Sequence, residues 1–251
     1  VMAEAGYIAG VQKRLGANIL DIDCTCRVCG RHLDACVSHS ETCAIGEATR
    51  GHYAVVRAVV DGLKLADSAV TTEPRGLTST QARPADIFTS AAVPGRSAAL
   101  DVCIASPEAA AAGEDAAESA FKRKLAHYRH VIPELQAAGI AFRPLIWTAD
   151  GRPHPATTRT LKFAAEAAAR KRGGVAVPGL LARWKHEITV AIIRRRVAML
   201  RAVLPKPGAR ELWMLSGTSD ESGFGAEGRL PSIEEENGDS ADDASLNEVA
   251  M

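Results

Sequence analysis

The sequence of 251 residues contains 30 basic and 30 acidic side chains, so its formal net charge is zero. Apolar residues make up 47% of the chain, which is typical of a soluble globular protein with one substantial core. No segment reaches the roughly 18 apolar residues of a membrane-spanning helix, and the first residues lack the features of a secretory signal. We therefore expect a protein that stays inside the cell and has no membrane partner.

The zero net charge conceals an uneven distribution along the chain. Residues 217–251 hold ten acids and one arginine among many serines and glycines, and we predict that the segment 206–251 is a disordered acidic tail. Residues 158–210, in contrast, hold 13 lysines or arginines and two glutamates. A basic body of this kind favours a polyanionic partner.

The N-terminal part is predicted to form a helix over residues 3–15, followed by a stretch rich in cysteine and histidine at 21–46. Five of the six cysteines lie between Cys24 and Cys43. In a reducing compartment, this clustering indicates a metal site rather than disulfides. The pattern Cys-x2-Cys followed by His-x3-Cys predicts a tetrahedral zinc site with the ligands Cys26, Cys29, His39 and Cys43.

Protein ligands fill all four positions of this predicted zinc site, so the zinc would have a structural role. Two cysteines, Cys24 and Cys36, remain spare, and either is an alternative ligand. In the other interpretation, the thiols carry no metal and pack as small apolar side chains.

The periodicity of apolar residues over the rest of the chain predicts helices and strands in alternation. We expect a long amphipathic helix, three strands, a helical region, a further strand and two basic helices. Their predicted ranges are 47–67, 69–72, 85–89, 98–105, 107–138, 140–148, 157–172 and 179–204. The order helix, strand, strand, strand, helix, strand indicates an α/β fold.

The second and third predicted strands each contain one acid in an apolar setting, Asp86 and Asp101. A buried carboxylate is costly unless it is paired, protonated or bound to a metal. Mg²⁺ would accept oxygen ligands from both acids and keep positions open for water and a phosphate oxygen. Lys124 and Tyr128, four residues apart, would share one helix face and reach the same phosphate. In the alternative interpretation, Asp86 opens a turn and Asp101 pairs with an arginine such as Arg96.

Two further features are candidate contacts to nucleic acid. The last predicted helix carries the run Arg194, Arg195 and Arg196. Burial of the apolar side of this helix would leave these arginines facing outward, where they either contact phosphates or form a solvated face. His52 is interpreted either as a packed or capping side chain or as a residue that faces a catalytic site or DNA.

In this order, the motifs resemble the C-terminal part of the polyproteins of site-specific non-LTR retrotransposons. In that family, a CCHC zinc knuckle follows the reverse transcriptase and precedes a restriction-enzyme-like endonuclease of the PD-(D/E)xK superfamily, whose core is αβββαβ around a mixed central sheet. The resemblance covers residues 15–201. It rests on the zinc knot and on the segments Arg50-Gly51-His52-Tyr53, Arg83-Pro84-Ala85-Asp86, Ala99-Leu100-Asp101-Val102 and Lys124-x3-Tyr128.

The resemblance implies a domain organisation in five parts. These parts are the end of an upstream region at 1–20, the zinc knuckle at 21–46, the endonuclease core at 47–150, a basic helical extension at 151–205 and the acidic tail. The partners implied are target DNA and the element's RNA, and we expect a nuclear location. A polymerase domain is missing from this sequence, which begins at Val1, so we expect a fragment of a longer polyprotein.

The activity implied by the resemblance is Mg²⁺-dependent hydrolysis of a DNA phosphodiester. The family uses the released 3′-hydroxyl to prime reverse transcription. Asp86 and Asp101 match the acids that hold the metal. Lys124 would position the attacking water or neutralise charge in the transition state, and Tyr128 would orient the phosphate or the lysine.

Three departures from the family pattern bear on this expectation. Ala85 stands where a proline would directly precede the first acid, and Tyr53 replaces an expected asparagine. Cys103 occupies the position where the superfamily usually has lysine, so Lys124 on the following helix would take that role, as it does in this branch. The alternatives to a working nuclease are a non-catalytic zinc-knuckle remnant that binds nucleic acid and an expressed relic of such an element.

Overall fold

The computed structural model describes residues 4–20, 24–43, 45–79, 83–109, 113–173 and 176–205. The predicted acidic tail lies outside these residues. Within them, no helix combines the length and the apolar character that a membrane crossing requires. The helices are α1 (Glu4–Leu15), α2 (Ser40–Cys43), α3 (Ile45–Leu63), α4 (Ala116–Tyr128), α5 (Ile132–Ala137), α6 (Pro155–Arg172) and α7 (Val177–Val203). The strands are β1 (Cys24–Thr25), β2 (His32–Leu33), β3 (Thr71–Thr72), β4 (Ile87–Val93), β5 (Arg96–Ala105) and β6 (Ala141–Thr148).

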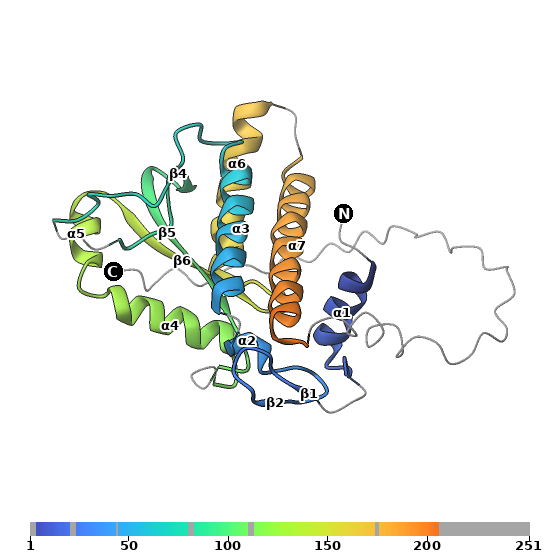
Figure 1. Cartoon of the computed structure of the whole chain (residues 1–251). Helices are drawn as coiled ribbons and strands as arrows, with labels where there is room; N and C mark the ends of the chain where they lie inside the picture. The colour runs from blue at the N-terminus through green and yellow to red at the C-terminus, as the bar shows by residue number, and fades with distance from the viewer. Residues whose placement is uncertain are drawn as a thin grey trace, which may run out of the picture. The chain divides into compact units, whose positions relative to one another are not determined.

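A four-stranded mixed sheet in the order β3-β4-β5-β6 forms the centre of the fold (Figure 1). The pairs β3/β4 and β4/β5 are antiparallel, whereas β5 and β6 are parallel. A parallel pair needs a long crossover, which α4 and α5 supply. The predicted α/β class is therefore confirmed, and the predicted order of elements is observed as α3, β3, β4, β5, α4 with α5, and β6.

The predicted helical region 107–138 differs from the observed one in two places. Helix α4 begins only at Ala116, because the Asp115 carboxylate accepts hydrogen bonds from the backbone N–H groups of Ala117 and Glu118 and so caps the helix there. The region is also divided, since α4 ends at Tyr128 and the separate helix α5 has a proline in its first turn.

Helices cover both faces of this sheet. Helices α3, α6 and α7 pack on one face, against a cluster that includes Leu100 and Val102 of β5. Helices α4 and α5 pack on the other face, where Ala99 lies in a second cluster. Side chains alternate between the two faces of a strand, so Asp101, between Leu100 and Val102, belongs to the face that α4 covers. The pleat of β5 thus directs the central acid towards Lys124.

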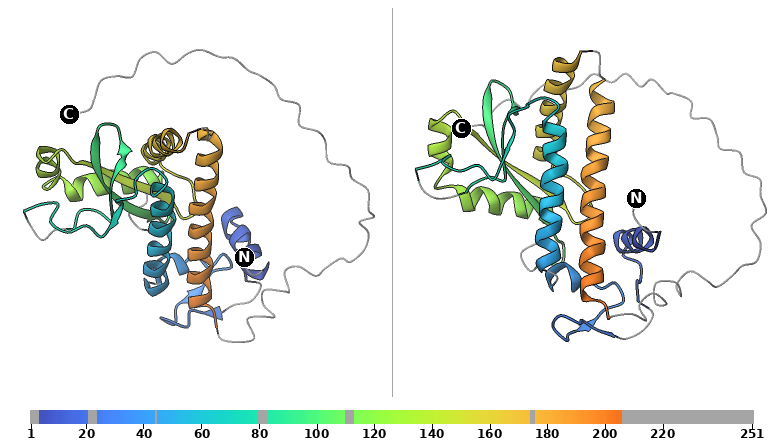
Figure 2. Two further views of the ribbon diagram at one scale, coloured as in Figure 1. Left: turned by 90° about the horizontal axis from the view of Figure 1, so that it is seen from above. Right: turned by 45° about the horizontal axis from the view of Figure 1, so that its top comes forward.

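Helices α3 and α7 lie side by side, as Figures 1 and 2 both show. Their close approach depends on glycine. A Cβ atom on Gly62 would lie only 2.0 Å from Cε2 of Trp184, whose indole N–H donates a hydrogen bond of 3.0 Å to the Ala58 carbonyl. Trp184 is buried and held on its polar edge, so it has little freedom to move away.

We predict that Gly62→Ala destabilises the protein by about 2–3 kcal/mol, because the added methyl group overlaps with the Trp184 ring. The matched control is Gly46→Ala in the same helix, where the nearest atom to an added Cβ is Arg50 Nη2 at 3.9 Å. That substitution should be neutral or stabilising by up to about 1 kcal/mol, since alanine favours a helix over glycine. Denaturant unfolding measures both, and equal effects at the two positions would contradict the role of Gly62.

Asp67 joins the end of α3 to strand β4. Its carboxylate accepts hydrogen bonds from Ala69 N–H (2.9 Å), the Thr89 hydroxyl (2.8 Å), Ser90 N–H (2.7 Å) and the Ser90 hydroxyl (3.0 Å). Burial raises the pKa of the Asp67 carboxyl, but the hydrogen bonds, led by that from Ser90 N–H, outweigh burial and bring the pKa below its usual range. The ionised form therefore stabilises the fold.

Asp67→Ala is expected to cost about 2 kcal/mol at neutral pH, because the buried Thr89 hydroxyl and the Ser90 N–H lose their acceptor. The folded-state pKa lies below the unfolded value of about 3.9, so this contribution is complete above that value and is lost as the pH falls through the folded-state pKa. The difference between parent and variant in unfolding free energy should shrink below about pH 4. Asp61→Ala, which removes an exposed carboxylate from α3, is the control and should change stability by less than about 0.5 kcal/mol at either pH.

Candidate metal centre and acidic site

The Cys/His residues form a compact cluster near the β1/β2 hairpin and α2. The ligand atoms of Cys26, Cys29, His39 and Cys43 all lie within 4.8 Å of one another. The two sulfurs of Cys26 and Cys43 are 3.7 Å apart, and Cys29 Sγ is 3.0 Å from His39 Nε2. Two thiolates on a tetrahedral zinc ion lie about 3.8 Å apart, given Zn–S bonds of about 2.3 Å. The four residues predicted from spacing thus form one cluster that could bind a metal such as zinc.

A tight turn brings the first two cysteines of this cluster together. Gly30 has φ of +73°, and its N–H donates to the Cys26 carbonyl at 2.7 Å. Burial raises the pKa of the Cys26 thiol, but hydrogen bonds to its sulfur, including those from the N–H groups of Cys29 and Val28, bring the pKa below its usual value. These N–H groups favour the thiolate, which is the form that binds a metal. Cys36, one of the spare cysteines, lies outside the cluster, and its Sγ contacts the Gly16 carbonyl at 3.5 Å.

The cluster is packed against the C-terminal end of α7 (Figure 2). Arg27, between the first two cysteines, donates from Nε to the Ala202 carbonyl at 2.6 Å and from its backbone N–H to the Val203 carbonyl at 2.9 Å. Carbonyls at the end of a helix lack partners within that helix, and a cation near them is favourable. The hairpin therefore caps α7 as well as carrying two of the candidate ligands.

Arg196 ties the same region to the core. Its Nε lies 2.6 Å from Glu41 Oε1 in α2, and its Nη1 lies 2.6 Å from Asp150 Oδ1 after β6. The residue is 4% exposed, so the prediction that it faces outward is wrong. Its two acidic partners come from distant segments and compensate for its burial. Of the other two arginines in the run, Arg194 is exposed, whereas Arg195 is half-buried and donates to the Ala48 carbonyl.

We predict that the purified protein contains one zinc ion per chain and that the Cys29→Ser variant has lost this zinc. The variant should also have a much lower melting temperature, because the free energy of binding a structural zinc adds to the free energy of folding. Cys36→Ser makes the same chemical change outside the cluster and should retain both zinc and stability. Metal content by elemental analysis and thermal unfolding provide the two readouts. Loss of zinc in Cys36→Ser with retention in Cys29→Ser would contradict the ligand set.

The two acids, the lysine and the tyrosine lie together on the α4 side of the sheet. Lys124 Nζ is 3.1 Å from Asp101 Oδ1 and 2.9 Å from Oδ2. Asp86 precedes β4 instead of lying inside a strand as predicted, and its N–H donates to the Leu100 carbonyl on β5 at 2.9 Å. Its Oδ2 accepts the N–H of Val102 at 2.7 Å. The backbone of β5 thus fixes the Asp86 carboxylate beside Asp101.

These contacts decide between the two interpretations of the acids. Asp101 is paired with Lys124, and Arg96 is not its partner. Asp86 does more than open a turn, since its Oδ1 lies 3.4 Å from His52 Nε2 on α3 while Oδ2 binds the β5 backbone. The structure therefore brings His52 from α3 and Lys124 from α4 to the same pair of carboxylates.

The negative charges of Asp86 and Asp101 favour a cation at this site. Burial raises the pKa of the Asp101 carboxyl, and the negative charge of Asp86 adds to this effect, whereas Lys124 lowers it; the net shift is upward. Asp101 Oδ2 is buried and close to the ammonium of Lys124, but it accepts no hydrogen bond from any described residue. Asp101 therefore pairs with Lys124 through both of its oxygens, and the Asp86 carboxylate adds a second negative charge beside this pair.

Tyr128 completes the α4 side of the site. Its ring packs against Phe142 with centroids 5.0 Å apart, and Lys124 Nζ lies 5.8 Å from the centre of the Tyr128 ring. Burial, followed by the charge of Asp101, raises the pKa of the Tyr128 phenol, so the hydroxyl stays protonated at neutral pH. The tyrosine can therefore donate a hydrogen bond near the acids.

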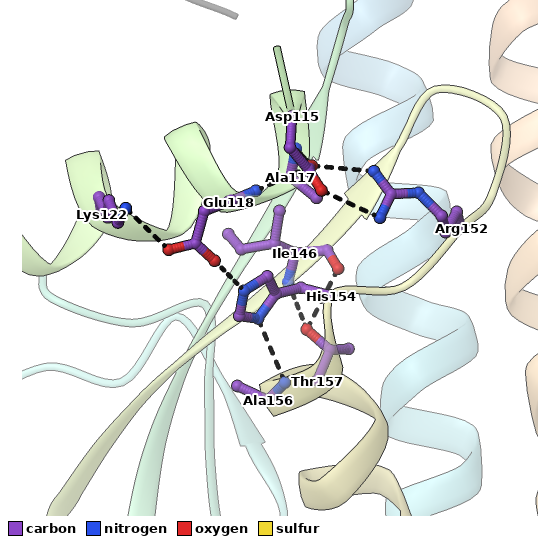
Figure 3. A network of polar contacts seen from close by, with 9 residues as sticks. All are labelled: Asp115, Ala117, Glu118, Lys122, Ile146, Arg152, His154, Ala156 and Thr157. Atoms are coloured by element: carbon purple, nitrogen blue, oxygen red, sulfur yellow. Dashed lines mark hydrogen bonds and ion pairs between the residues drawn. The ribbon is translucent and has the colours of Figure 1, made fainter. Parts of the chain in front are cut away.

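A second polar network holds α4 in place (Figure 3). Arg152, in the loop after β6, makes two hydrogen bonds of 2.8 and 3.3 Å to Asp115, the residue that caps α4. His154 contacts Glu118 of α4 through Nε2 at 2.9 Å, and its Nδ1 accepts the Ala156 N–H, so Nε2 is the donor. Figure 3 shows these pairs side by side between α4 and the start of α6. The network fixes the helix that carries Lys124.

Sequence reasoning missed the basic residues that follow Lys124 at the end of α4. Arg129 and His130 are exposed and lie beside the acidic site in a groove along this helix. The sequence does contain a run of basic residues that begins at Lys122, but a run of charged residues alone does not indicate a functional site.

No model of a known protein family matches the chain, and neither a curated protein nor a solved structure matches it. The chemistry of the two clusters is thus the basis for any function. The Cys/His cluster, with four protein ligands, is suited to a closed structural metal site. The acid pair offers hard oxygen ligands beside a lysine, which suits a divalent cation and a phosphate.

Proposed function

We propose that this chain is a metal-dependent DNA endonuclease domain of the PD-(D/E)xK type, related to those of non-LTR retrotransposons. The observation that carries the proposal is the convergence of Asp86, Asp101 and Lys124, which are far apart in the sequence but meet beside one strand. The element order and the mixed sheet support the same proposal, because the superfamily core has the order αβββαβ.

Asp86 and Asp101 are the residues that would hold Mg²⁺. The fit is supported by Asp101 Oδ2, which is buried and has an ion pair with Lys124 but no hydrogen bond from a described residue, and by the Asp86 carboxylate held next to it. When bound, the cation supplies Lewis-acid polarisation of the scissile phosphate and lowers the pKa of a bound water. Carboxylate oxygens are the ligands that Mg²⁺ prefers.

The protein's own side chains have distinct roles in this proposal. Lys124 carries positive charge at the site and would neutralise charge that develops on the phosphate. It takes the place of the usual strand lysine, whose position is occupied by half-buried Cys103. The Tyr128 hydroxyl would donate a hydrogen bond to a phosphate oxygen, and His52 would keep the Asp86 carboxylate in its orientation.

A non-catalytic domain that binds nucleic acid is the second candidate. It is favoured by one observation, the basic groove along α4, which needs no metal to attract a polyanion. The two candidates differ in what they require of the acids. Binding alone would survive Asp86→Ala, whereas cleavage would not.

We expect the purified, zinc-loaded protein to nick supercoiled plasmid when Mg²⁺ or Mn²⁺ is present. Asp101→Asn and Lys124→Met should each lower the rate by about 100-fold or more, because each removes several kcal/mol of transition-state stabilisation. Asp61→Asn neutralises an exposed acid on α3, away from the acid pair, and serves as the matched control that keeps full activity.

Two results would refute the endonuclease. One is the absence of nicking by a folded, zinc-loaded protein with either cation. The other is nicking that persists at the parental rate in Asp101→Asn, which would point to a contaminating nuclease. Binding of DNA without nicking would favour the second candidate.

A further inference from the structure

A groove lies along the C-terminal half of α4 and its connection to α5. Its lining includes Lys124 and Tyr128 of the acidic site, together with Cys103 of strand β5. Beyond these residues it is lined by Arg123, His127, Arg129 and His130. The groove therefore begins at the residue that pairs with Asp101 and continues away from it.

The charges of this groove all have one sign. Each ionisable residue in its lining, Cys103 and Tyr128 apart, is basic, and no carboxylate from the described part of the chain lines it. Arg123 and His127 are four residues apart on one side of α4, and His130 lies in the turn that follows the helix. Lys122, on a different side of the helix, pairs with Glu118 at 3.2 Å.

Arg129 and His130 are exposed, and no carboxylate among the described residues forms an ion pair with either. Small side chains, Ala120 and Ala126, form part of the lining between the basic groups. The groove thus offers positive charge that can neutralise phosphates. Such a lining suits contacts to a sugar–phosphate backbone.

A second groove, between α3 and α7, is less suitable for a polyanion. Its lining contains four arginines and three acids, namely Arg50, Arg57, Arg194 and Arg195 with Glu47, Asp61 and Glu187. Glu47 pairs with Arg50 at 3.1 Å, and Glu187 pairs with Arg183 at 3.1 Å. The acids in its lining offset part of the positive charge there, whereas the described lining of the α4 groove contains no acid.

Resting on the proposed endonuclease, we propose that the α4 groove binds the phosphate backbone of the DNA substrate on one side of the scissile bond. When the scissile phosphate lies at Asp101 and Lys124, the adjacent phosphates of the same DNA strand lie next to this site. The α4 groove supplies basic side chains there. Arg129 and His130 are then contacts to the backbone and take no part in the chemical step.

The test is fluorescence anisotropy of a labelled duplex of about 30 bp, measured over a range of salt concentrations without added Mg²⁺, so that binding is observed without cleavage. Arg129→Gln, alone and with His130→Gln, should weaken binding by roughly 3–10-fold and reduce the slope of log K against log salt by about one for each phosphate that is no longer neutralised. The matched control is Arg170→Gln, an exposed arginine on α6 in the opposite helical layer, which should change neither quantity.

Each outcome decides the proposal. It is overturned if the parent binds no duplex, if Arg129→Gln and Arg170→Gln behave alike, or if Arg194→Gln lowers the salt slope while Arg129→Gln leaves it unchanged. Exposed positions are chosen so that folding is retained, and matching melting temperatures verify this. Failure of the endonuclease would show in the nicking assay alone, since the anisotropy experiment requires no catalysis.

Discussion

Arg196 is buried between two acids, and this ion triad holds the separate parts of the chain together. One partner, Glu41, belongs to the short helix that carries candidate metal ligands, and the other, Asp150, follows the last strand of the sheet. Arg196 and Glu41 are both buried, whereas Asp150 is partly exposed. Desolvating the buried charges is expensive, so the triad adds little net stability, but removing Glu41 or Arg196 would leave a buried charge and cost about 3–5 kcal/mol. The triad therefore sets how the metal cluster docks on α7 more than how stable the fold is.

This docking fits the structural role expected for the Cys/His cluster. Arg27 is bound to the last carbonyls of α7, and Arg196 is buried and paired with Glu41 of α2. The cluster is thus part of the body of the protein. A metal bound there would stabilise the end of the longest helix, whose other side packs on α3 through Gly62 and Trp184.

The acidic site, in contrast, costs the fold stability. Asp101 lies in the middle of a central strand with 4% exposure, where an apolar residue would pack at lower cost. Lys124 reaches it from α4, and α4 is in turn braced by the pairs Asp115–Arg152 and Glu118–His154. A site that is costly to bury and is supported from two sides is typical of a functional centre.

The sequence by itself determined the features that depend on local spacing. The ligands from Cys26 to Cys43 lie within one short stretch, and the alternation along β5 directs Asp101 to one face, so both could be predicted. Only the tertiary structure decided which charged groups meet. Arg196 looked like an exposed residue because its partner Glu41 is 155 positions away, and His52 could not be assigned to Asp86 without the packing of α3 on the sheet. Sequence spacing determines which nearby side chains share a face of a helix or strand. Long-range ion pairs depend on how helices pack in three dimensions, and a local sequence pattern carries no information about that packing.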